Sequence, residues 1–335
     1  MPVSVVCGGQ FGSEGKGKVA HEIARREKAS IVIRVGGANS GHTVIDQAGR
    51  ERKFRMLPTA AILPDIICVI PPGAYIDVEV LLKEIAETGI DRDRLLIDPF
   101  AMIVSEVHKA DEAASGLRSS IGSTLSGTGS AVMARIGRDG KAHFARDDDR
   151  LSPYTKTGTT AFLRERLKGG KRVVIEGTQG FGLSLLHGRD YPYVTSRDTS
   201  AAGFVSEAGL SPRDVDDIVM VIRAFPIRVA GNSGELPGEI DWETLRRESG
   251  YREQIVEHTT VTGTIRRIAR FHPDIVRAAI ACNNPTRIVL NHLDYVDVQC
   301  RTTNVLSDKT KVFLDRAENA IDAPVDFLGF GPSQM

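Results

Sequence analysis

The residues best suited to chemistry form a glycine-rich segment near the start of the chain, residues 8–18 (GGQFGSEGKGK). Backbone amides in such a turn, followed by the first turn of a helix, bind phosphate oxygens. Lys16 and Lys18 add two cations for the β- and γ-phosphates of a nucleoside triphosphate. Residues 12–18 fit the P-loop pattern G-x-x-x-x-G-K, but Val19 stands where a P-loop has Ser or Thr to bind Mg²⁺. We therefore expect a P-loop-like phosphate site that holds its metal differently.

A second glycine-rich turn, residues 36–43 (GGANSGHT), carries His42 after the next predicted strand. A histidine beside a phosphate site can donate a proton to a transferring phosphoryl group or stabilise its charge. A single histidine is more often an ordinary core or surface residue. Its place at the end of the neighbouring strand favours the catalytic interpretation here.

Three polar segments fall between predicted elements: residues 123–129 (STLSGTG), 176–180 (EGTQG) and 187–195 (HGRDYPYVT). The first offers hydroxyls and backbone amides to a phosphate. It fails as the dinucleotide pattern G-x-G-x-x-G, because Val132 replaces the third glycine. The second closes a strand with an amide that can bind a base edge or a ribose, and the third places polar side chains on a loop stiffened by proline.

Two later segments add recognition chemistry. Residues 259–270 (TTVTGTIRRIAR) put hydroxyls and three arginines on one loop. Forked hydrogen bonds from arginine suit a small dicarboxylate, although such a basic run is more often a solvated face. Residues 291–294 (NHLD) follow a predicted strand, and a carboxylate at Asp294 can accept two donors from a guanine edge.

The elements that must position these loops are short apolar strands alternating with helical patterns. Strands are expected over residues 3–6, 29–35, 66–70, 172–175, 218–222 and 287–290. Helices are expected over residues 18–27, 78–88, 159–167, 244–249 and 273–281. Strands that are apolar throughout are buried on both faces. This predicts one α/β domain over residues 1–335, a largely parallel twisted sheet covered by helices with small excursions, and ligands at the carboxyl ends of the strands.

Composition excludes several other classes of protein. The 335 residues carry 43 Lys plus Arg against 43 Asp plus Glu, so binding of nucleic acid through bulk charge is not expected. The start of the chain lacks the basic and apolar regions of a signal peptide, and the longest apolar stretch, residues 60–72, is too short to span a membrane. The four scattered cysteines indicate small buried side chains in a reducing compartment. We expect a cytoplasmic protein without a membrane or nucleic-acid partner.

Taken in order, these motifs resemble the adenylosuccinate synthetase family over nearly the whole chain. The glycine-rich segment 8–18 and the pair EGTQG and HGRDYPYVT are the most specific of them. The resemblance implies an enzyme that couples cleavage of a nucleoside triphosphate to joining aspartate onto C6 of a purine nucleotide. It also implies Mg²⁺ as cofactor and a homodimer.

The sequence departs from the family pattern G-D-E-G-K-G-K at Ser13, where the family has the Asp that removes the N1 proton of hypoxanthine. A hydroxyl is no base at neutral pH without an activating partner. It is compact and uncharged, and it can accept a hydrogen bond from the 2-amino group of guanine. This variant resembles the phage-encoded branch that joins aspartate to dGMP with ATP, in which case the host cytoplasm is the expected location. Thr264, where the family has Arg, and His292, where the GTP-reading loop has Lys, agree with a shifted specificity.

The resemblance implies a role for each matching position. Ser13, Lys16 and His42 are the expected catalytic residues, with His42 as general acid while the γ-phosphoryl moves to O6 before aspartate displaces phosphate. Expected contacts to the mononucleotide and aspartate are Ser13, Asn39, Thr124, Arg138 (across a dimer interface), Gln179, Thr195, Val229 and Ala230 (sugar), and Thr262 and Arg266 (aspartate). Expected triphosphate contacts are Gly12, Glu14, Gly15, Lys16, Gly17, Lys18, Gly41, His42, Thr43, Asn291 and Asp294. Ser13 and the Gly41 carbonyl are expected at Mg²⁺.

Several alternatives stay open. An ordinary adenylosuccinate synthetase acting on IMP with GTP predicts an acid at position 13. A nucleotide sensor without turnover does not need Lys16, His42 and Arg266 together. The preferred triphosphate, the basis for choosing deoxyribose and the group that removes the N1 proton are not determined. A water held by Ser13 and Glu14 is one candidate for that proton acceptor.

Overall fold

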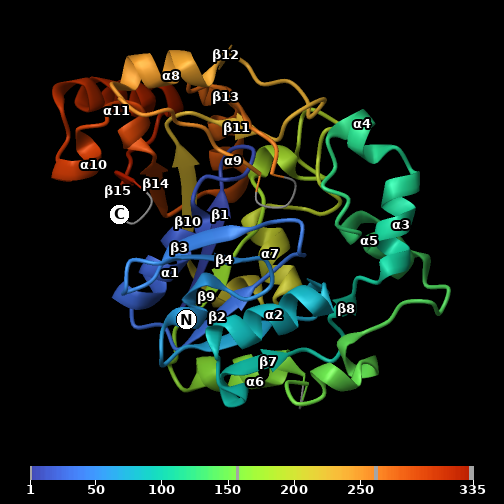
Figure 1. Ribbon diagram of the computed structural model, residues 1–335. Helices are drawn as coiled ribbons and strands as arrows, with labels where there is room; N and C mark the ends of the chain where they lie inside the picture. Colours follow the sequence, from blue (N-terminus) through green and yellow to red (C-terminus); the bar gives the residue numbers. More distant parts are fainter. Residues whose placement is uncertain (1, 156–157, 260–262, 332–335) are drawn as a thin grey trace.

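The computed structural model describes residues 2–155, 158–259 and 263–331, and it is built around an eight-stranded sheet (Figure 1). The strand order is β15-β14-β10-β1-β9-β2-β5-β7, and every neighbouring pair is parallel. Its strands are β1 (Val3–Gly8), β2 (Ile31–Arg34), β5 (Ile67–Ile70), β7 (Leu95–Ile97), β9 (Val173–Glu176), β10 (Val215–Arg223), β14 (Arg287–Asn291) and β15 (Phe327–Leu328).

Helices cover both faces of this sheet. Successive residues of each strand point to opposite faces, so strands that are apolar throughout give the sheet two apolar faces. In β2, Ile31 and Ile33 belong to one apolar core and Val32 to the other. The first core is completed by α6 (Thr159–Lys168), α7 (Ala201–Glu207), α9 (Pro273–Asn283) and α11 (Asp308–Ile321). The second is completed by α1 (Lys16–Arg26) and α2 (Val78–Thr88). The predicted parallel α/β fold is confirmed.

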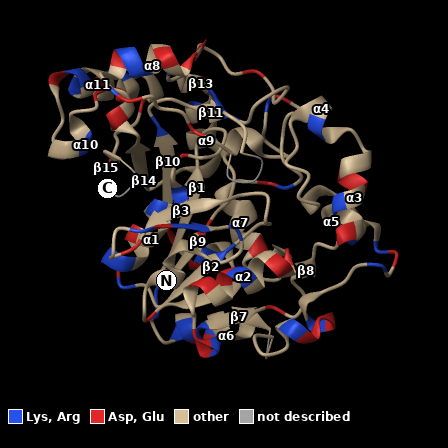
Figure 2. Cartoon of the chain, viewed as in Figure 1, with Lys and Arg blue, Asp and Glu red and all other residues tan. Residues whose placement is uncertain are grey.

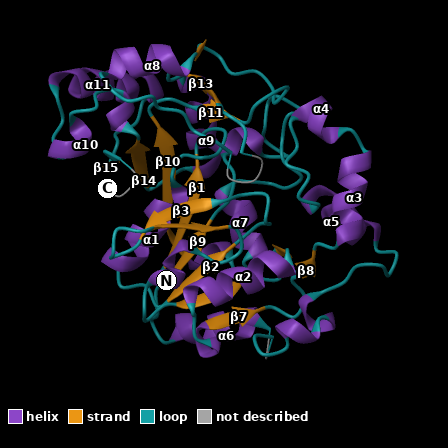
Figure 3. Ribbon diagram, viewed as in Figure 1, coloured by secondary structure: helices purple, strands orange, loops and turns teal. Residues whose placement is uncertain are grey.

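The excursions from the sheet carry much of the loop-rich part of the chain (Figure 3). They include the hairpin β3 (His42–Ile45) and β4 (Glu51–Phe54), the pair β6 (Tyr75–Ile76) and β8 (Met102–Ile103), and a small sheet of β11 (Ile227–Arg228), β12 (Glu239–Ile240) and β13 (Arg267–Ala269). Helices α3 (Glu106–Ala114), α4 (Leu117–Ile121) and α5 (Thr128–Gly137) stand to one side of the sheet (Figure 1), and α8 (Trp242–Ser249) and α10 (Cys300–Thr303) lie near its other edge.

The six strands and five helices expected from the sequence are present, with bounds that differ by a few residues. The sequence missed β7 and β15, which are only three and two residues long and are defined by pairing at the sheet edges. Helices α3, α4, α5, α7, α10 and α11 were also missed. The start of α5 lies inside the segment 123–129, which its glycines made us treat as a loop throughout.

The structure shows where the charged residues and the cysteines lie. Acidic and basic residues are interspersed over the helices (Figure 2), and no helix of the described residues is long and apolar enough to cross a membrane. Burial raises the pKa of the Cys7 and Cys68 thiols to about 12, and Cys300 is also buried. Cys282, however, is exposed, so the expectation of four buried cysteines is wrong at that position.

Candidate active site

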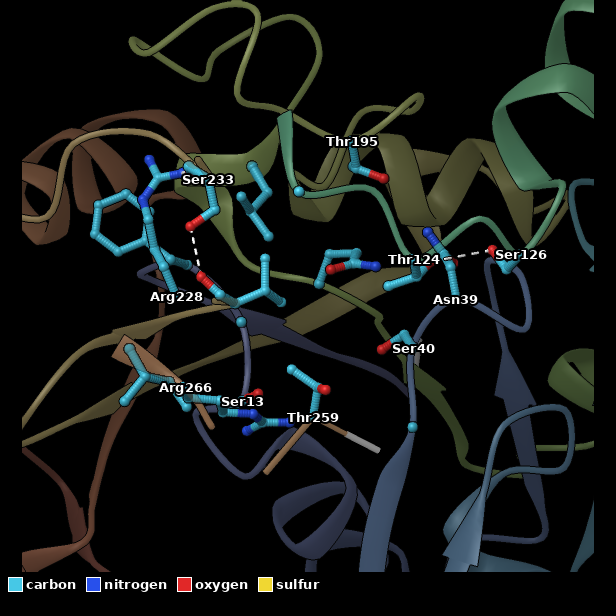
Figure 4. A pocket seen from close by; sticks show the side chains of 18 of the residues that line it. Ser13, Asn39, Ser40, Thr124, Ser126, Thr195, Arg228, Ser233, Thr259 and Arg266 are labelled. Carbon is cyan, nitrogen blue, oxygen red and sulfur yellow. Dashed lines mark hydrogen bonds between the residues drawn. The ribbon is translucent and has the colours of Figure 1, made fainter. Parts of the chain in front are cut away.

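A cavity of about 390 Å³ lies where β1, β2, β9, β10 and β14 end, at the predicted edge of the sheet (Figure 4). The side chains around it fall into segments that are far apart in the sequence. The lining residues come from the segments 11–18, 39–43, 117–129, 193–196 and 227–233, together with Glu112, Gln179, Leu183, Glu257, Thr259, Arg266, His292 and Gly331. The structure thus brings together most of the motifs singled out in the sequence.

The buried carboxylate of Glu14 fixes the conformation of the glycine-rich loop through hydrogen bonds. Glu14 Oε1 accepts hydrogen bonds from the amides of Gln10 (3.1 Å) and Gly12 (2.8 Å), and its Oε2 lies 2.5 Å from Lys16 Nζ. Glu14 is fully buried, whereas Lys16 and Lys18 line the cavity. Because Gly12 (φ 92°) and Gly15 (φ 93°) adopt left-handed conformations, the loop can turn tightly around Glu14. Burial lowers the pKa of Lys18 to about 8.

His42 lies on the cavity wall and is bonded to a carboxylate behind it. Its Nδ1 is 2.6 Å from Glu176 Oε1, which also accepts from Arg34 Nη1 at 2.6 Å. Glu176 Oε2 accepts from the amide and the hydroxyl of Thr59, both at 2.8 Å. Arg34 Nη1, a donor, also lies 2.9 Å from His42 Nδ1, but its shorter contact is to Glu176 Oε1. Since a carboxylate only accepts hydrogen bonds, we assign the ring proton to Nδ1, which leaves Nε2 for the cavity. This is the arrangement by which a carboxylate orients a histidine for proton transfer.

The charge on His42 follows from this setting. Burial and the nearby Arg34 guanidinium lower its pKa to about 4, against 6.5 for the unperturbed ring. The imidazole is therefore neutral at pH 7 in the ligand-free protein. A bound triphosphate would bring negative charge to Nε2 and favour the protonated ring, which Glu176 then stabilises.

Helix α1 approaches His42 so closely that its second residue must be glycine. A Cβ placed on Gly17 would lie 2.6 Å from the Cβ of His42 and 2.8 Å from Cγ2 of Thr59. Real Cβ atoms do not tolerate such distances, so any larger residue would displace the histidine or the helix. The two glycine-rich segments of the sequence are thus packed directly against each other.

Ser13 sits in a left-handed conformation (φ 58°) that a buried ion network stabilises. Its carbonyl oxygen accepts from Arg223 Nη1 at 2.9 Å, and the fully buried Arg223 is paired with Glu257 at 2.5 Å. Glu257 also accepts from Arg266 Nη1 (3.2 Å) and Tyr295 Oη (3.0 Å). Burial alone would raise the pKa of Glu257, but Arg223 and the other surrounding cations hold it well below its usual value. Ser13 and Arg266 both line the cavity and are labelled in Figure 4.

The opposite side of the cavity is lined by amides and hydroxyls. Asn39, Thr124, Gln179 and Thr195 all line it, and Asn39 Oδ1 is buried without a partner. Thr124 Oγ1 donates to Ser126 Oγ at 3.3 Å (Figure 4). This cluster can bind a phosphate through hydroxyl and amide donors.

One expected donor set is already occupied. Glu112 accepts from the amides of Gly127 (2.8 Å), Gly129 (2.6 Å) and Ser130 (3.3 Å) at the start of α5. The expectation that the backbone of residues 123–129 binds phosphate is therefore wrong for the amides of Gly127 and Gly129. The hydroxyls of the segment stay available on the cavity side.

Some residues expected at the triphosphate do not line the cavity. Of the described residues named for triphosphate binding, Gly12, Gly15, Gly17, Gly41 and Thr43 line the cavity with the lysines and His42, whereas Glu14, Asn291 and Asp294 do not. Asn291 Nδ2 donates to the Glu14 carbonyl at 2.7 Å. Asp294 accepts from Tyr251 Oη at 2.7 Å, its Oδ1 has no partner, and burial raises its pKa.

Of the residues expected to contact the mononucleotide and aspartate, some line the cavity and others do not. Val229 and Arg266 line the cavity, but Ala230 does not. Arg138 ends α5 at the surface, where its Nε donates to the Ile136 carbonyl at 3.3 Å. Thr262 lies outside the described residues.

Sequence reasoning missed the buried charges that hold the site, and they share one signal. Arg34, Glu176 and Arg223 are the last residues of β2, β9 and β10, and all three are buried. A charged residue that ends an apolar parallel strand lies at the ligand-binding edge of the sheet. That signal was available in the sequence.

The described residues contain no group of three or more His, Cys, Asp or Glu placed to hold a metal ion. The oxygen donors expected at Mg²⁺, the Ser13 hydroxyl and the Gly41 carbonyl, belong to residues that line the cavity. Mg²⁺ commonly keeps several waters and binds few protein groups along with substrate phosphates. These neutral oxygens fit a metal held mainly by its substrates.

Two solved structures share this fold over nearly the whole chain. Succinoaminodeoxyadenylate synthetase of cyanophage S-2L, bound to dGMP and to dATP as an energy donor, gives a TM-score of 0.83 at 31% identity, with 99% of this chain and 93% of that chain covered. Adenylosuccinate synthetase of Plasmodium falciparum gives 0.85 at 20% identity, with 99% and 98% covered, and supports the fold alone. The fold and the cavity are those of a nucleotide-binding α/β ligase.

The family follows from the sequence comparisons. A family model described as adenylosuccinate synthetase matches residues 5–145 and 142–300. Adenylosuccinate synthetases of Methanococcus aeolicus and Archaeoglobus fulgidus are 37% and 35% identical over 340 and 338 residues, covering 99% of this chain and 97% and 96% of theirs. The chain belongs to the adenylosuccinate synthetase family of carbon–nitrogen ligases, which act in purine biosynthesis.

Proposed function

We propose that this ligase joins L-aspartate to C6 of dGMP with cleavage of ATP, giving N6-succino-2-amino-2′-deoxyadenylate. The observation that carries the proposal is Ser13, a neutral and compact side chain on the cavity wall where the family pattern has Asp. A carboxylate there would crowd the 2-amino group of guanine, whereas a hydroxyl can accept its hydrogen bond. The similarity to the cyanophage synthetase that binds dGMP supports the same substrate.

The chemistry proceeds in two steps. The N1 proton passes to solvent water as O6 of the purine attacks the γ-phosphorus and ADP leaves, with Lys16 and His42 stabilising the charge in transfer. The amine of aspartate, whose carboxylate Arg266 binds, then adds to C6, phosphate leaves with the former O6, and the nitrogen gives up one proton to water. The Glu257 carboxylate, paired with both Arg266 and Arg223, keeps the aspartate-binding guanidinium beside Ser13.

The acceptor of the N1 proton is constrained by Glu14. A water held by Ser13 and Glu14 was one candidate, but both Glu14 carboxylate oxygens are already bonded to Lys16 and to backbone amides. Glu14 also lies outside the cavity lining. The structure therefore gives no support to a water activated by this carboxylate.

Mg²⁺ belongs to the proposal as a cofactor that Ser13 Oγ and the Gly41 carbonyl would help to hold. When bound, it supplies charge neutralisation on the phosphate oxygens. His42 and Lys16 supply the remaining donors from the protein.

A homodimer is also part of the proposal, with Arg138 reaching the neighbouring active site. Met133 and Ile136, on the same helix α5, are 65% and 68% exposed and give a partner subunit two apolar side chains to cover. Sedimentation of the wild type and of Met133→Glu tests this. We expect a dimer that the substitution weakens, and a monomeric wild type would contradict it.

The ordinary reaction with IMP and GTP is the second candidate, favoured by the 37% identity to an archaeal adenylosuccinate synthetase. Ser13→Asp and Ser13→Ala separate the two. We expect Ser13→Asp to shift kcat/KM from dGMP towards IMP, and Ser13→Ala, which adds no bulk or charge, to keep the preference for dGMP. If Ser13→Asp keeps the dGMP preference unchanged, the steric argument is wrong.

A further inference from the structure

The turn that follows β11, residues 229–233, lines the cavity with Val229 and Ser233. We propose that this turn selects 2′-deoxyribose over ribose, because it presents the apolar side chain of Val229 and keeps the Ser233 hydroxyl bonded within the protein. The inference rests on the proposed function in that a purine nucleotide occupies the cavity. It adds the group that distinguishes the two sugars.

The polar atoms of Ser233 are hydrogen-bonded within the turn and to two neighbouring arginines. Ser233 Oγ donates to the Val229 carbonyl at 2.6 Å, as drawn in Figure 4, and accepts from Arg267 Nη1 at 3.2 Å. The Ser233 amide donates to the Gly231 carbonyl at 2.9 Å, and the Ser233 carbonyl accepts from Arg228. The one proton of the Ser233 hydroxyl is thus committed, and the carbonyl nearest to it already has a donor.

The position of the turn places it beside the sugar. A Cβ built on Gly122 would lie 3.3 Å from Val229 Cγ2 and 3.2 Å from the Ser233 Cβ, so the end of α4 is packed against the turn. Thr124, two residues further on, belongs to the hydroxyl cluster that can bind phosphate. Since a 5′-phosphate is one ester bond from its sugar, the wall next to this cluster faces the sugar.

The neighbouring surface is apolar as well. Ile121, Leu183 and Ile227 line the same cavity. A 2′-hydroxyl placed against this wall loses water, and the Ser233 proton is not free to bond it because it is donated to the Val229 carbonyl. An unpaired buried hydroxyl costs enough to give a deoxyribonucleotide an advantage of about ten- to a hundredfold in kcat/KM.

Two substitutions test the turn: one removes the hydroxyl that covers a carbonyl, and the other adds a hydroxyl to the apolar side chain. Ser233→Ala uncovers the Val229 carbonyl as an acceptor, and Val229→Thr adds a hydroxyl at nearly constant side-chain volume. Asn232→Ala is the matched control, because Asn232 is exposed and bonds only outward from the same turn, to the Ser120 carbonyl at 2.8 Å. Thermal melts establish that each variant is folded.

The readout is the ratio of kcat/KM for the deoxyribonucleotide to that for the ribonucleotide, measured with dGMP against GMP and with dIMP against IMP. We expect a wild-type ratio of about ten or more, a fall of at least severalfold in Ser233→Ala and Val229→Thr, and no change in Asn232→Ala. If only hypoxanthine nucleotides react, the proposed function fails while the dIMP and IMP ratio still tests the turn. A wild-type ratio near one, or a ratio that neither variant lowers, overturns the inference.

Discussion

The two halves of the cavity are held in different ways. The phosphoryl half, formed by residues 8–18, Arg34, His42 and Glu176, is attached to the ends of central strands and fixed by buried ion pairs. The sugar half, formed by residues 117–129, 193–196 and 227–233, lies on excursions and presents mainly hydroxyls and apolar side chains, with one buried cation, Arg228, paired with Asp190. The difference suggests that the phosphoryl half is intolerant of change because its parts share partners, whereas the sugar half can be altered to change specificity.

The largest expected effect is on the histidine of the phosphoryl half. His42→Ala removes the proton donor to the transferring phosphoryl group, so we expect kcat to fall about a thousandfold. Phosphate release at saturating substrates measures it, and a preserved thermal melt excludes unfolding. A loss of less than tenfold would show that His42 does not act in phosphoryl transfer.

The tight packing in the same half predicts the next largest effect. Gly17→Ala introduces a Cβ where 2.6 Å separates it from the His42 Cβ, so the ring must move. A displacement of about 1 Å lowers kcat roughly a hundredfold. Gly158→Ala is the control, because a Cβ there meets nothing within 4 Å. Equal activity of the two variants would contradict the close packing.

We expect His42, in the phosphoryl half, to make the folding stability of the protein sensitive to acid. Burial and Arg34 lower the pKa of His42 to about 4, against 6.5 for the unperturbed ring. Between these values the unfolded chain binds a proton that the folded protein does not. Folding stability should therefore fall as the pH drops from about 6.5 towards 4, by up to about 1.4 kcal/mol per pH unit.

Urea titrations at pH 7 and pH 5 on the wild type and on His42→Asn test this contribution. The variant should lose less stability on acidification, because its side chain takes up no proton. Identical losses in the two proteins would mean that the ring is not buried as a neutral group.

The smallest effect is expected in the sugar half. Ser126→Ala removes the hydroxyl that is hydrogen-bonded to the hydroxyls of both Thr124 and Thr128, while those two hydroxyls stay in place. We expect the KM for the mononucleotide to rise about threefold with kcat unchanged, the loss of one neutral hydrogen bond. A large fall in kcat instead would remove the contrast between the two halves.

The sequence indicated the phosphoryl half better than the sugar half for physical reasons. Apolar strands ending in glycine-rich turns imply a parallel sheet with ligands at its edge, and this was enough to bring residues 8–18 and His42 together. It was not enough to show that Glu112 occupies the amides at the start of α5, or that Ser233 covers the Val229 carbonyl. The Glu112 bonds join two separate segments of the chain, and the Ser233 bond closes one turn without a sequence pattern that specifies it.

Buried charges were the other gap. Arg223 and Glu257 are 34 positions apart in the chain, and only the fold shows that they clamp Ser13 and Arg266. Asp294, predicted as an acceptor for a base edge, is buried with one oxygen bonded to Tyr251 and the other without a partner, which the sequence did not indicate.

The most direct test of the central claim is the substrate itself. The protein is incubated with aspartate, Mg²⁺ and each pairing of IMP, GMP or dGMP with ATP, dATP or GTP, and the products are identified by mass. We predict a succinylated product from dGMP in amounts well above those from IMP or GMP. A succinylated product from IMP alone would contradict the account.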